Sequence, residues 1–342
     1  MQTEAFVLTQ VGAAQTAFQR KEVEVKAPES GEVLIESEAF GLNYADVMAR
    51  LGLYREAPPM PCVIGYELVG RIIQVGRDVP INLIGKRVLA FTRFGAYARH
   101  AVTKMEAVQE IPEDFDASEA LPFATQGVTA YYMTHILAPV QHQDNVLVHA
   151  AAGGVGSFLV QLAKLRGATV FANTSSDLKI PYIKSLGADH VINYKKSTYQ
   201  IQLSPLIGAQ KLQVSYNPIA GKTSKTDLNL LGAGGRLFLF GGSDLAQRKG
   251  LAGKLKFLWE MGFILPIGLM MQSKNILGVN MLKIADAQPL LIKNSMAELL
   301  KLYEQQQLKL PAIKTFSAQQ FAEAHDALGA GTTSGKLVVR WD

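Results

Sequence analysis

Apolar and polar residues alternate along the middle of the chain in a pattern typical of strands followed by helices. A buried strand is predicted at 146–148, and a turn from Ala150 to Gly154 leads into a helix that begins near Val155 and ends near Leu165. Further strands are predicted at 168–172, 190–192, 212–216 and 236–240, with a helix at 178–186. This alternation predicts a parallel sheet that is covered by helices on both faces.

The residues before this sheet follow another pattern, in which short apolar runs are interrupted by glycine and proline. The runs at 33–35, 69–75, 87–91 and 97–102 predict a small antiparallel β-barrel. Helices are expected near 45–51 and 117–137, then a strand at 275–279, helices at 295–305 and 318–328, and a last strand at 336–340 that returns to the barrel. The fold class is therefore α/β, with a barrel domain at 1–124 and 285–342 and a doubly wound parallel-sheet domain at 125–284.

The turn after the first strand of the sheet is rich in glycine. Gly153, Gly154 and Gly156 have no side chains where the backbone must turn sharply and approach a pyrophosphate, and Ala152 and Val155 lie between or beside them. Amides at the start of the helix would point at the anion. The run predicts a dinucleotide site, with Ala150 at the first glycine position of the fingerprint. An ordinary strand-to-helix turn is the alternative.

Composition narrows the choice of partners. The 342 residues suit about two domains, and 48% hydrophobic with 18% charged residues indicate a globular protein. The net charge of +5 comes from scattered basic residues, which argues against a nucleic-acid partner and suits a phosphate-bearing ligand. The single cysteine, Cys62, excludes a disulfide within the chain and a thiolate zinc cluster, and we interpret it as a small buried apolar residue.

The sequence shows no pattern typical of a secretory signal at Met1–Phe6, so a cytoplasmic location is expected. The most apolar segment, Met261–Met271, is interrupted by Pro266 and is shorter than the roughly 20 residues that span a bilayer. It is interpreted as a pocket-lining or interface segment, with a peripheral membrane contact as the alternative. The strand at 275–279 would form an exposed sheet edge, which predicts a homodimer.

Several motifs together resemble one superfamily. They are Gly65-Tyr-Glu-Leu-Val-Gly70, Ala151-Ala-Gly-Gly-Val-Gly156, Gly41-Leu-Asn-Tyr-Ala-Asp46, Gln126-Gly-Val-Thr-Ala-Tyr131 and Val191-Ile-Asn-Tyr194. The chain resembles medium-chain dehydrogenases/reductases, and within them the zinc-independent quinone oxidoreductase branch. Leu42–Tyr54, Asp227–Leu231 and Ser273–Ala285 look most similar to vesicle amine transport protein homologues.

This resemblance implies a GroES-like catalytic domain, a Rossmann domain and an NADPH-dependent oxidoreductase that transfers a hydride to a small quinone or α,β-unsaturated carbonyl compound. The alternative function is a nucleotide-binding, membrane-associated interaction protein with little turnover. No metal is expected: Tyr66 stands where zinc enzymes of the superfamily have a histidine ligand, and the first cysteine position falls at Leu42-Asn43. A phenol and an amide are poor zinc ligands.

The end of the second strand of the sheet indicates which nicotinamide cofactor binds. Folds that prefer NAD have an acidic residue there for the ribose 2′-hydroxyl, but the residue here is Asn173. Ser175 could donate a hydrogen bond and Lys179 could pair with a 2′-phosphate. The resemblance places Lys179 and Tyr194 at positions that bind this phosphate. A solvated helix residue is the alternative for Lys179, and NADP(H) is the expected cofactor.

Hydride transfer places negative charge on the substrate, which requires a hydrogen-bond donor or an acid. The resemblance assigns Tyr54 as the proton donor and Asn43 as an amide near the nicotinamide and the substrate, with a packing aromatic and a capping amide as the respective alternatives. It implies further cofactor contacts for four residues: Thr129, Phe240, Ser243 and Asn280. His149 is interpreted as a core histidine and Glu67 as a structural residue near the site.

Overall fold

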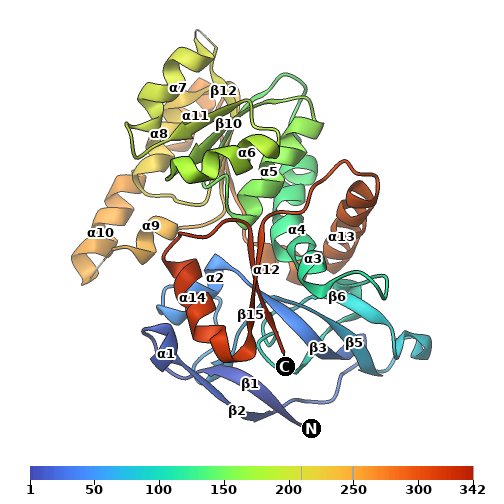
Figure 1. Ribbon diagram of the computed structural model, residues 1–342. Coiled ribbons are helices and arrows are strands. Elements are labelled where there is room, and N and C mark those ends of the chain that lie inside the picture. The colour runs from blue at the N-terminus through green and yellow to red at the C-terminus, as the bar shows by residue number, and fades with distance from the viewer. Residues whose placement is uncertain (209, 249, 342) are drawn as a thin grey trace. The chain divides into compact units, whose positions relative to one another are not determined.

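The computed structural model describes residues 1–208, 210–248 and 250–341, and the chain divides into two compact units (Figure 1). The barrel unit consists of Met1–Val128, Met281–Gln306 and Leu310–Asp342. The sheet unit consists of Thr129–Asn280 and Gln307–Lys309.

The strands of the barrel unit form two sheets. In the larger sheet the order is β15-β16-β3-β5-β6-β8, and β7 also pairs with β3. The smaller sheet has the order β2-β1-β4. The strands are β1 (Gln2–Leu8), β2 (Phe18–Glu24), β3 (Glu32–Leu42), β4 (Cys62–Val63), β5 (Glu67–Val75), β6 (Arg87–Phe91), β7 (His100–Lys104), β8 (Val108–Glu110), β15 (Ile313–Ser317) and β16 (Lys336–Arg340).

Short helices connect these strands, and an aromatic core fills the space between them. Phe6 stacks on Phe321 at 4.0 Å between ring centroids and on Trp341 at 5.4 Å, while Phe40 lies 4.9 Å from the buried Tyr97. The helices are α1 (Ala14–Ala17), α2 (Tyr44–Arg50), η1 (Ile81–Leu83), η2 (Met105–Ala107), α3 (Ala117–Ala120), η3 (Leu121–Phe123), α12 (Met281–Ala287), α13 (Pro289–Glu304), η6 (Ala318–Gln320) and α14 (Phe321–Gly329).

The sheet unit contains a parallel six-stranded sheet in the order β11-β10-β9-β12-β13-β14. Its chain order reverses direction after β11, the topology of a doubly wound sheet, and the β14 edge is left without a partner strand among the described residues. The strands are β9 (Asn145–Val148), β10 (Thr169–Thr174), β11 (His190–Asn193), β12 (Leu212–Asn217), β13 (Leu231–Leu239) and β14 (Asn275–Gly278).

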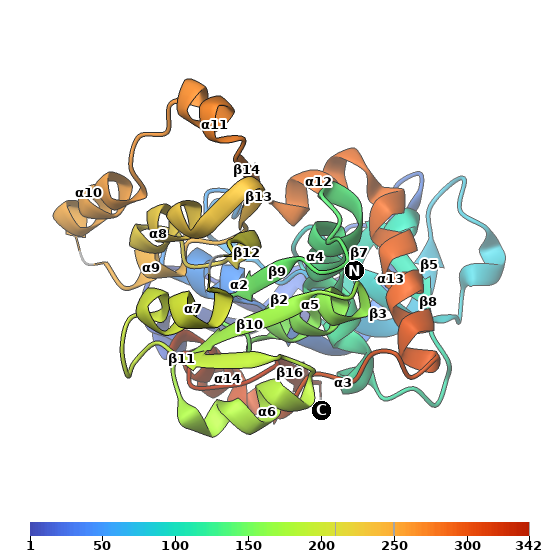
Figure 2. The same cartoon turned by 90° about the horizontal axis from the view of Figure 1, so that it is seen from above.

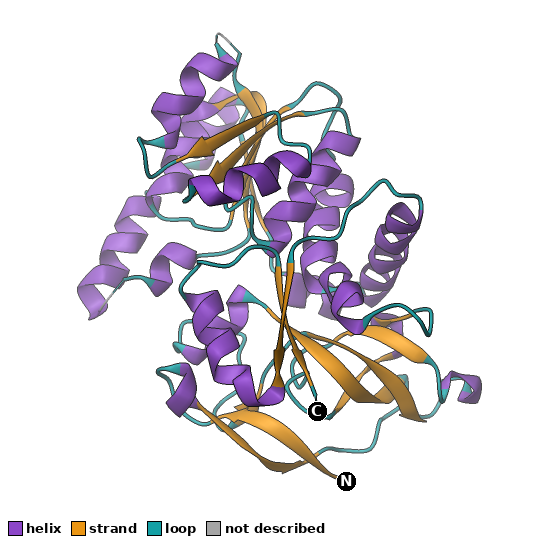
Figure 3. Ribbon diagram, viewed as in Figure 1, coloured by secondary structure: helices purple, strands orange, loops and turns teal. Residues whose placement is uncertain are grey.

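Helices cover both faces of this sheet, as Figures 2 and 3 show for α5 on one side and α7 and α8 on the other. On the second side, Leu203 and Ile207 of α7 pack with Leu147 and Leu237 of the strands. The helices are α4 (Thr125–Tyr131, which begins in the barrel unit), the π-helix η4 (Tyr132–Leu137), α5 (Gly154–Leu165), η5 (Asp177–Lys179), α6 (Ile180–Ser185), α7 (Tyr199–Ile207), α8 (Lys222–Leu230), α9 (Ser243–Ala246), α10 (Gly250–Met261) and α11 (Pro266–Gln272).

The predicted parallel sheet is confirmed strand by strand, and the last strand does return to the barrel, since β16 pairs with β3. One prediction needs correction. The strand expected at 97–102 begins only at His100, because Ala98 forms a β-bridge with Ala5 and the backbone N–H of Tyr97 donates to the Ile64 carbonyl. The helical prediction for 117–137 is confirmed, and the stretch consists of four short helices with Pro122 inside the second.

None of the described helices combines the length and the hydropathy that crossing a bilayer requires.

Candidate functional site

The glycine turn has the geometry of a phosphate-binding loop. Ala150, directly after His149, has a φ of 50°, and its carbonyl accepts a hydrogen bond from the Gly153 amide at 2.8 Å. A Cβ at Gly156 would lie 2.3 Å from this carbonyl oxygen, so only glycine fits there. Ala152 is buried, whereas Gly153, Gly154 and Val155 are partly exposed at the start of the 12-residue helix α5. The helix thus presents unpaired amides to an anion.

The structure brings Ser175 and Tyr194 to one edge of the sheet. Thr174 ends β10, and its carbonyl accepts a hydrogen bond from the Tyr194 amide at 3.1 Å, so the residues after β10 and β11 are neighbours. Lys179 follows on η5, and burial lowers the pKa of its ammonium group. All three predicted residues therefore lie beyond the carboxyl ends of two adjacent strands.

The acidic residue in this region is already engaged. Asp177 accepts a hydrogen bond from the side-chain Nδ2 of Asn193 at 2.9 Å and forms an ion pair with Lys196 at 2.8 Å. Both contacts lower the pKa of its carboxyl group. Lys196 and the neighbouring Lys195 were not among the predicted site residues. Their signal was the Tyr-Lys-Lys run directly after the third strand, which a parallel sheet places beside the end of the second.

The remaining predicted cofactor residues occupy three places in the sheet unit. The Phe240 amide donates to Asn217 at 3.3 Å and the Ser243 amide to Pro218 at 3.1 Å, so both lie beside the end of β12. Thr129 is buried in α4. Asn280 is exposed just after β14 and is the last residue of the stretch Thr129–Asn280 that forms most of the sheet unit.

A buried polar network supports this edge of the sheet, and His149 belongs to it, as expected of a core histidine. Asp227, which is fully buried, accepts hydrogen bonds from His149 Nε2 at 2.9 Å, Ser215 Oγ at 2.9 Å, Asn217 Nδ2 at 2.6 Å and Tyr199 Oη at 2.6 Å. Four donors around one carboxylate satisfy a charge that would otherwise be costly to bury.

In the barrel unit, Asn43 lies between β3 and α2. Its backbone amide donates to Asp46 Oδ2 at 2.7 Å, and its side-chain Nδ2 donates to Glu67 Oε1 at 2.9 Å. An amide nitrogen carries two hydrogens. Among the described residues only Glu67 accepts from this nitrogen, so the second hydrogen of the buried Asn43 side chain has no acceptor there.

Tyr54 is half-buried on the loop after α2. Its ring meets Tyr66 edge to face at 6.3 Å between centroids, and Tyr66 lies 5.4 Å from Phe94. Burial, and then the nearby Glu56 carboxylate, raise the pKa of Tyr54 to about 12. The phenol therefore stays protonated at neutral pH and can donate a hydrogen bond or a proton.

The side chains around Asn43 do not fit a zinc ion. Burial raises the pKa of the Tyr66 hydroxyl, so that it is not a ligand anion, and Glu67 is ion-paired with the buried Lys336. The Lys336 ammonium also donates to Asn43 Oδ1 at 3.2 Å and would repel a cation there. Among the described residues, no group of three or more histidine, cysteine, aspartate or glutamate side chains could hold a metal.

Asp46 gives this site a measurable pH dependence. It is fully buried, and desolvation raises the pKa of its carboxyl group to about 7. The pKa of the Asp46 carboxyl group is higher in the folded protein than in the unfolded chain. Its contribution to stability is therefore complete at low pH and is lost as the pH rises to the folded pKa. Between roughly pH 5 and pH 8, the free energy of unfolding of wild type should therefore fall by about 2–3 kcal/mol more than that of Asp46→Asn.

Urea unfolding of both proteins at the two pH values measures this difference. The exposed Asp114, changed to asparagine, is the matched control and should leave the pH dependence of the free energy of unfolding as in wild type. A difference between wild type and Asp46→Asn that is the same at both pH values would contradict the expectation.

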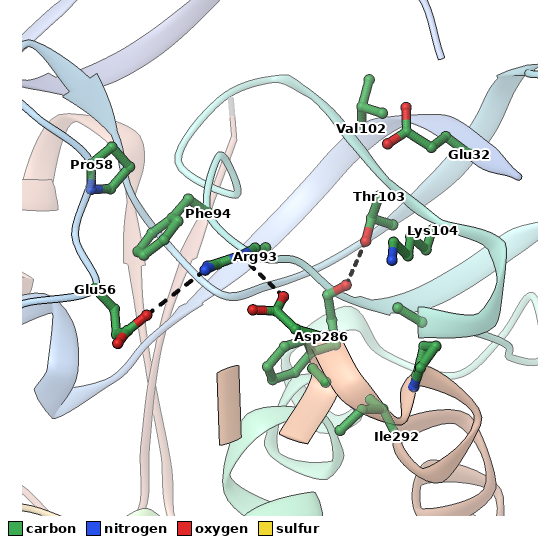
Figure 4. A pocket seen from close by; sticks show the side chains of 14 residues that line it. Glu32, Glu56, Pro58, Arg93, Phe94, Val102, Thr103, Lys104, Asp286 and Ile292 are labelled. Atoms are coloured by element: carbon green, nitrogen blue, oxygen red, sulfur yellow. Dashed lines mark hydrogen bonds and ion pairs between the residues drawn. The ribbon is translucent and has the colours of Figure 1, made fainter. Parts of the chain in front are cut away.

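The barrel unit also contains a cavity of about 520 Å³, shown in Figure 4. Glu56, Arg93, Phe94 and Asp286 are part of its wall. Arg93 bridges Asp286 at 3.0 Å and Glu56 at 3.7 Å. Lys283 also pairs with Glu56 at 3.0 Å, so these two cations and two carboxylates balance and offer a charged ligand little. The cavity is related to the site mainly through Phe94, which contacts Tyr66.

Comparison with known proteins agrees with this architecture. The sequence matches the family described as Alcohol dehydrogenase GroES-like domain over residues 29–140, and the family described as Zinc-binding dehydrogenase over residues 154–300. It is 31% identical to the human synaptic vesicle membrane protein VAT-1 homolog-like over 317 residues, which is 91% of this chain and 75% of that protein.

Solved structures of the same fold are also similar over nearly the whole chain. A quinone oxidoreductase from Pseudomonas syringae has a TM-score of 0.87 at 26% identity, with 99% of each chain covered. The mycobacterial protein Rv1454c, complexed with NADPH, has a TM-score of 0.85 at 26% identity, with 99% of each chain covered. The chain thus combines a GroES-like domain with a Rossmann domain, and it belongs to the medium-chain dehydrogenase/reductase superfamily, in the quinone oxidoreductase branch and close to the VAT-1 homologues.

Proposed function

We propose that the protein is an NADPH-dependent, zinc-independent oxidoreductase that reduces quinones or α,β-unsaturated carbonyl compounds. The observation that carries the proposal is a pair of donors, the Asn43 N–H and the protonated Tyr54, in surroundings that do not fit a metal. The similar quinone oxidoreductase and the similar NADPH complex support the same class of reaction.

The proposed cofactor residues divide the work of binding NADP(H). The amides of the first turn of α5, which begins at Gly154 directly after the turn residue Gly153, bind the pyrophosphate, and Ser175, Lys179 and Tyr194 bind the 2′-phosphate. Asp177 does not compete for the ribose, because Lys196 and Asn193 occupy its carboxylate. The other cofactor contacts that we propose are Asn43, Thr129, Ala152, Val155, Gly156, Phe240, Ser243 and Asn280.

Bound NADPH supplies the hydride, and the protein supplies stabilisation of the resulting charge. As the substrate gains negative charge on its oxygen, the Asn43 N–H donates a hydrogen bond to that oxygen. Tyr54 then provides a proton, since a phenol with a pKa of about 12 is fully protonated beforehand. An activated, conjugated acceptor fits a site of this kind because it carries part of the charge itself.

The direct test follows NADPH oxidation at its absorbance band with a panel of quinones and enals. We expect turnover with at least one acceptor and tighter binding of NADPH than of NADH. A protein that binds NADPH tightly but reduces no member of the panel would refute the proposed activity.

Changing Tyr54 to phenylalanine removes the donor and keeps the ring that packs on Tyr66. We expect kcat to fall about 100-fold, as for loss of a general acid, with an unchanged Kd for NADPH. Tyr303→Phe, in α13, serves as the matched control and should retain wild-type kcat. Equal kcat for Tyr54→Phe and wild type would exclude Tyr54 as the donor.

The alternative function, association with membranes, is favoured by one specific feature of the sheet unit. Helices α10 and α11 leave a set of large apolar side chains exposed, and Figure 2 shows α11 standing apart from the strands. Trp259 is 76% exposed, Phe263 92% and Met271 80%. Lys254 and Lys256, both exposed on α10, would suit an anionic lipid surface.

Co-sedimentation with vesicles that contain anionic lipid tests this alternative. Wild type should pellet with the vesicles, and Trp259→Ser/Phe263→Ser should lose most of the binding. Leu178→Ser, which replaces an exposed apolar residue outside α10 and α11, is the control. Equal sedimentation of wild type and the double variant would exclude the membrane role of this surface.

We also propose a homodimer, because β14 is an edge strand of the sheet. A monomer in sedimentation at micromolar concentration would refute it.

A further inference from the structure

Lys336 is a buried cation that the proposed chemistry does not yet use. It begins β16, and its side chain and that of its ion-pair partner Glu67 are both 0% exposed. Its Nζ also donates to the Leu42 carbonyl and to Asn43 Oδ1, each at 3.2 Å. An ammonium has three hydrogens and here it has three acceptors, which oppose the burial that lowers the pKa of Lys336.

The backbone around Lys336 makes room for this ion pair. A Cβ at Gly41 would lie 2.3 Å from Glu67 Oε1 and 2.4 Å from Lys336 Cε. Leu337 is paired with Leu42 in antiparallel register, which places Lys336 beside Asn43. The local sequence therefore accommodates a charge pair at this one point of the barrel unit.

The two charges, together with the capping box that Asn43 forms with Asp46 at the start of α2, hold the Asn43 amide in one orientation. Its oxygen accepts from the Lys336 ammonium, and its nitrogen donates to the Glu67 carboxylate at 2.9 Å. Rotating the amide by half a turn would set its hydrogens against the ammonium and its oxygen against the carboxylate, and both contacts would be repulsive. The remaining N–H of Asn43 is therefore held in one direction.

We propose that Lys336 is a positioning residue for the reduction: it holds the Asn43 amide so that its free N–H donates to the substrate oxygen. The inference rests on the proposed function. Lys336 does not contact the substrate and acts only through Asn43. Removing its charge should lower kcat and leave NADPH binding unchanged, because preorganised donors act on the transition state.

The test uses the double variant Glu67→Gln/Lys336→Met, which leaves no unpaired buried charge. Arg340→Met, an exposed cation of the same strand, is the control. We expect the double variant to lower kcat about tenfold or more, with an unchanged Kd for NADPH, and to change kcat less than twofold when Asn43 is already alanine. The inference would be overturned if the double variant lowered kcat equally in the wild-type and the Asn43→Ala backgrounds. It would also be overturned if the double variant had the melting temperature and the kcat of wild type.

A second readout does not depend on turnover. One side-chain amide proton of Asn43 is hydrogen-bonded to Glu67, so the Asn43 amide resonances should lie away from those of exposed asparagine side chains in nitrogen-15 correlation spectra of wild type. They should move towards those of exposed asparagines in the double variant as the amide loses its fixed orientation. Unchanged Asn43 resonances in the double variant would also overturn the inference. Failure of the proposed function is recognised separately, because wild type would then reduce no acceptor.

Discussion

Changing Gly156 to alanine is expected to lower the affinity for NADPH about 100-fold, or roughly 2.7 kcal/mol. The new Cβ would lie 2.3 Å from the Ala150 carbonyl oxygen and 2.8 Å from the Ala151 Cα. Both are backbone atoms, so no side-chain rotation relieves the contact and the whole turn must move. That shift also displaces the amides that face the pyrophosphate and should cost about 1–3 kcal/mol of folding stability.

Titration calorimetry with NADPH measures the affinity, and thermal unfolding shows that the variant is folded. Gly268→Ala is the matched control, since a Cβ there meets nothing within 4 Å and its affinity for NADPH should equal that of wild type. If Gly156→Ala bound NADPH as tightly as wild type, the glycine turn would not be the pyrophosphate site.

The second large effect is expected for Asp227→Ala, which should lower the free energy of unfolding by about 3–5 kcal/mol. The change removes the acceptor shared by His149, Ser215, Asn217 and Tyr199, and leaves their donors buried without it. Each unsatisfied donor carries a desolvation cost of its own. Because His149, Ser215 and Asn217 lie on or beside the neighbouring strands β9 and β12, NADPH binding should weaken as well.

Urea unfolding followed by circular dichroism measures the loss. Asn229→Ala on the exposed side of the same helix, α8, should change stability by no more than about 0.5 kcal/mol. A similar, small effect of both substitutions would mean that the Asp227 network contributes little to the sheet unit.

The sheet and its glycine turn could be predicted from the sequence because their signals are local. Strand β9 contains the apolar run 146–148, β12 alternates apolar with polar residues, and the turn needs glycine at fixed spacing from the strand end. The resemblance to a known superfamily then supplied the site residues that no local pattern distinguishes, Asn43 and Tyr54 among them. Their roles remain proposals that the experiments above test.

Other parts of the fold depend on contacts between distant residues, and these could not be predicted. Strands β1 and β2 have no simple alternation of apolar and polar residues that distinguishes them from the neighbouring sequence. No local pattern indicates that β15 pairs with β16. Lys336 looks like any lysine at the start of a strand until its partner Glu67, 269 residues earlier, is beside it. The same holds for Lys196, whose ion pair with Asp177 joins the turn after β11 to η5.

The barrel unit is built from three separated stretches of chain, and almost all of the sheet unit lies between the first two. During synthesis on the ribosome, Glu67 therefore emerges 269 residues before Lys336. Domains tend to fold as units while the chain is still growing. The sheet unit, with its glycine turn, can thus form before β16 has been made, whereas the charge pair beside Asn43 is completed only when β16 has been translated and joins β3.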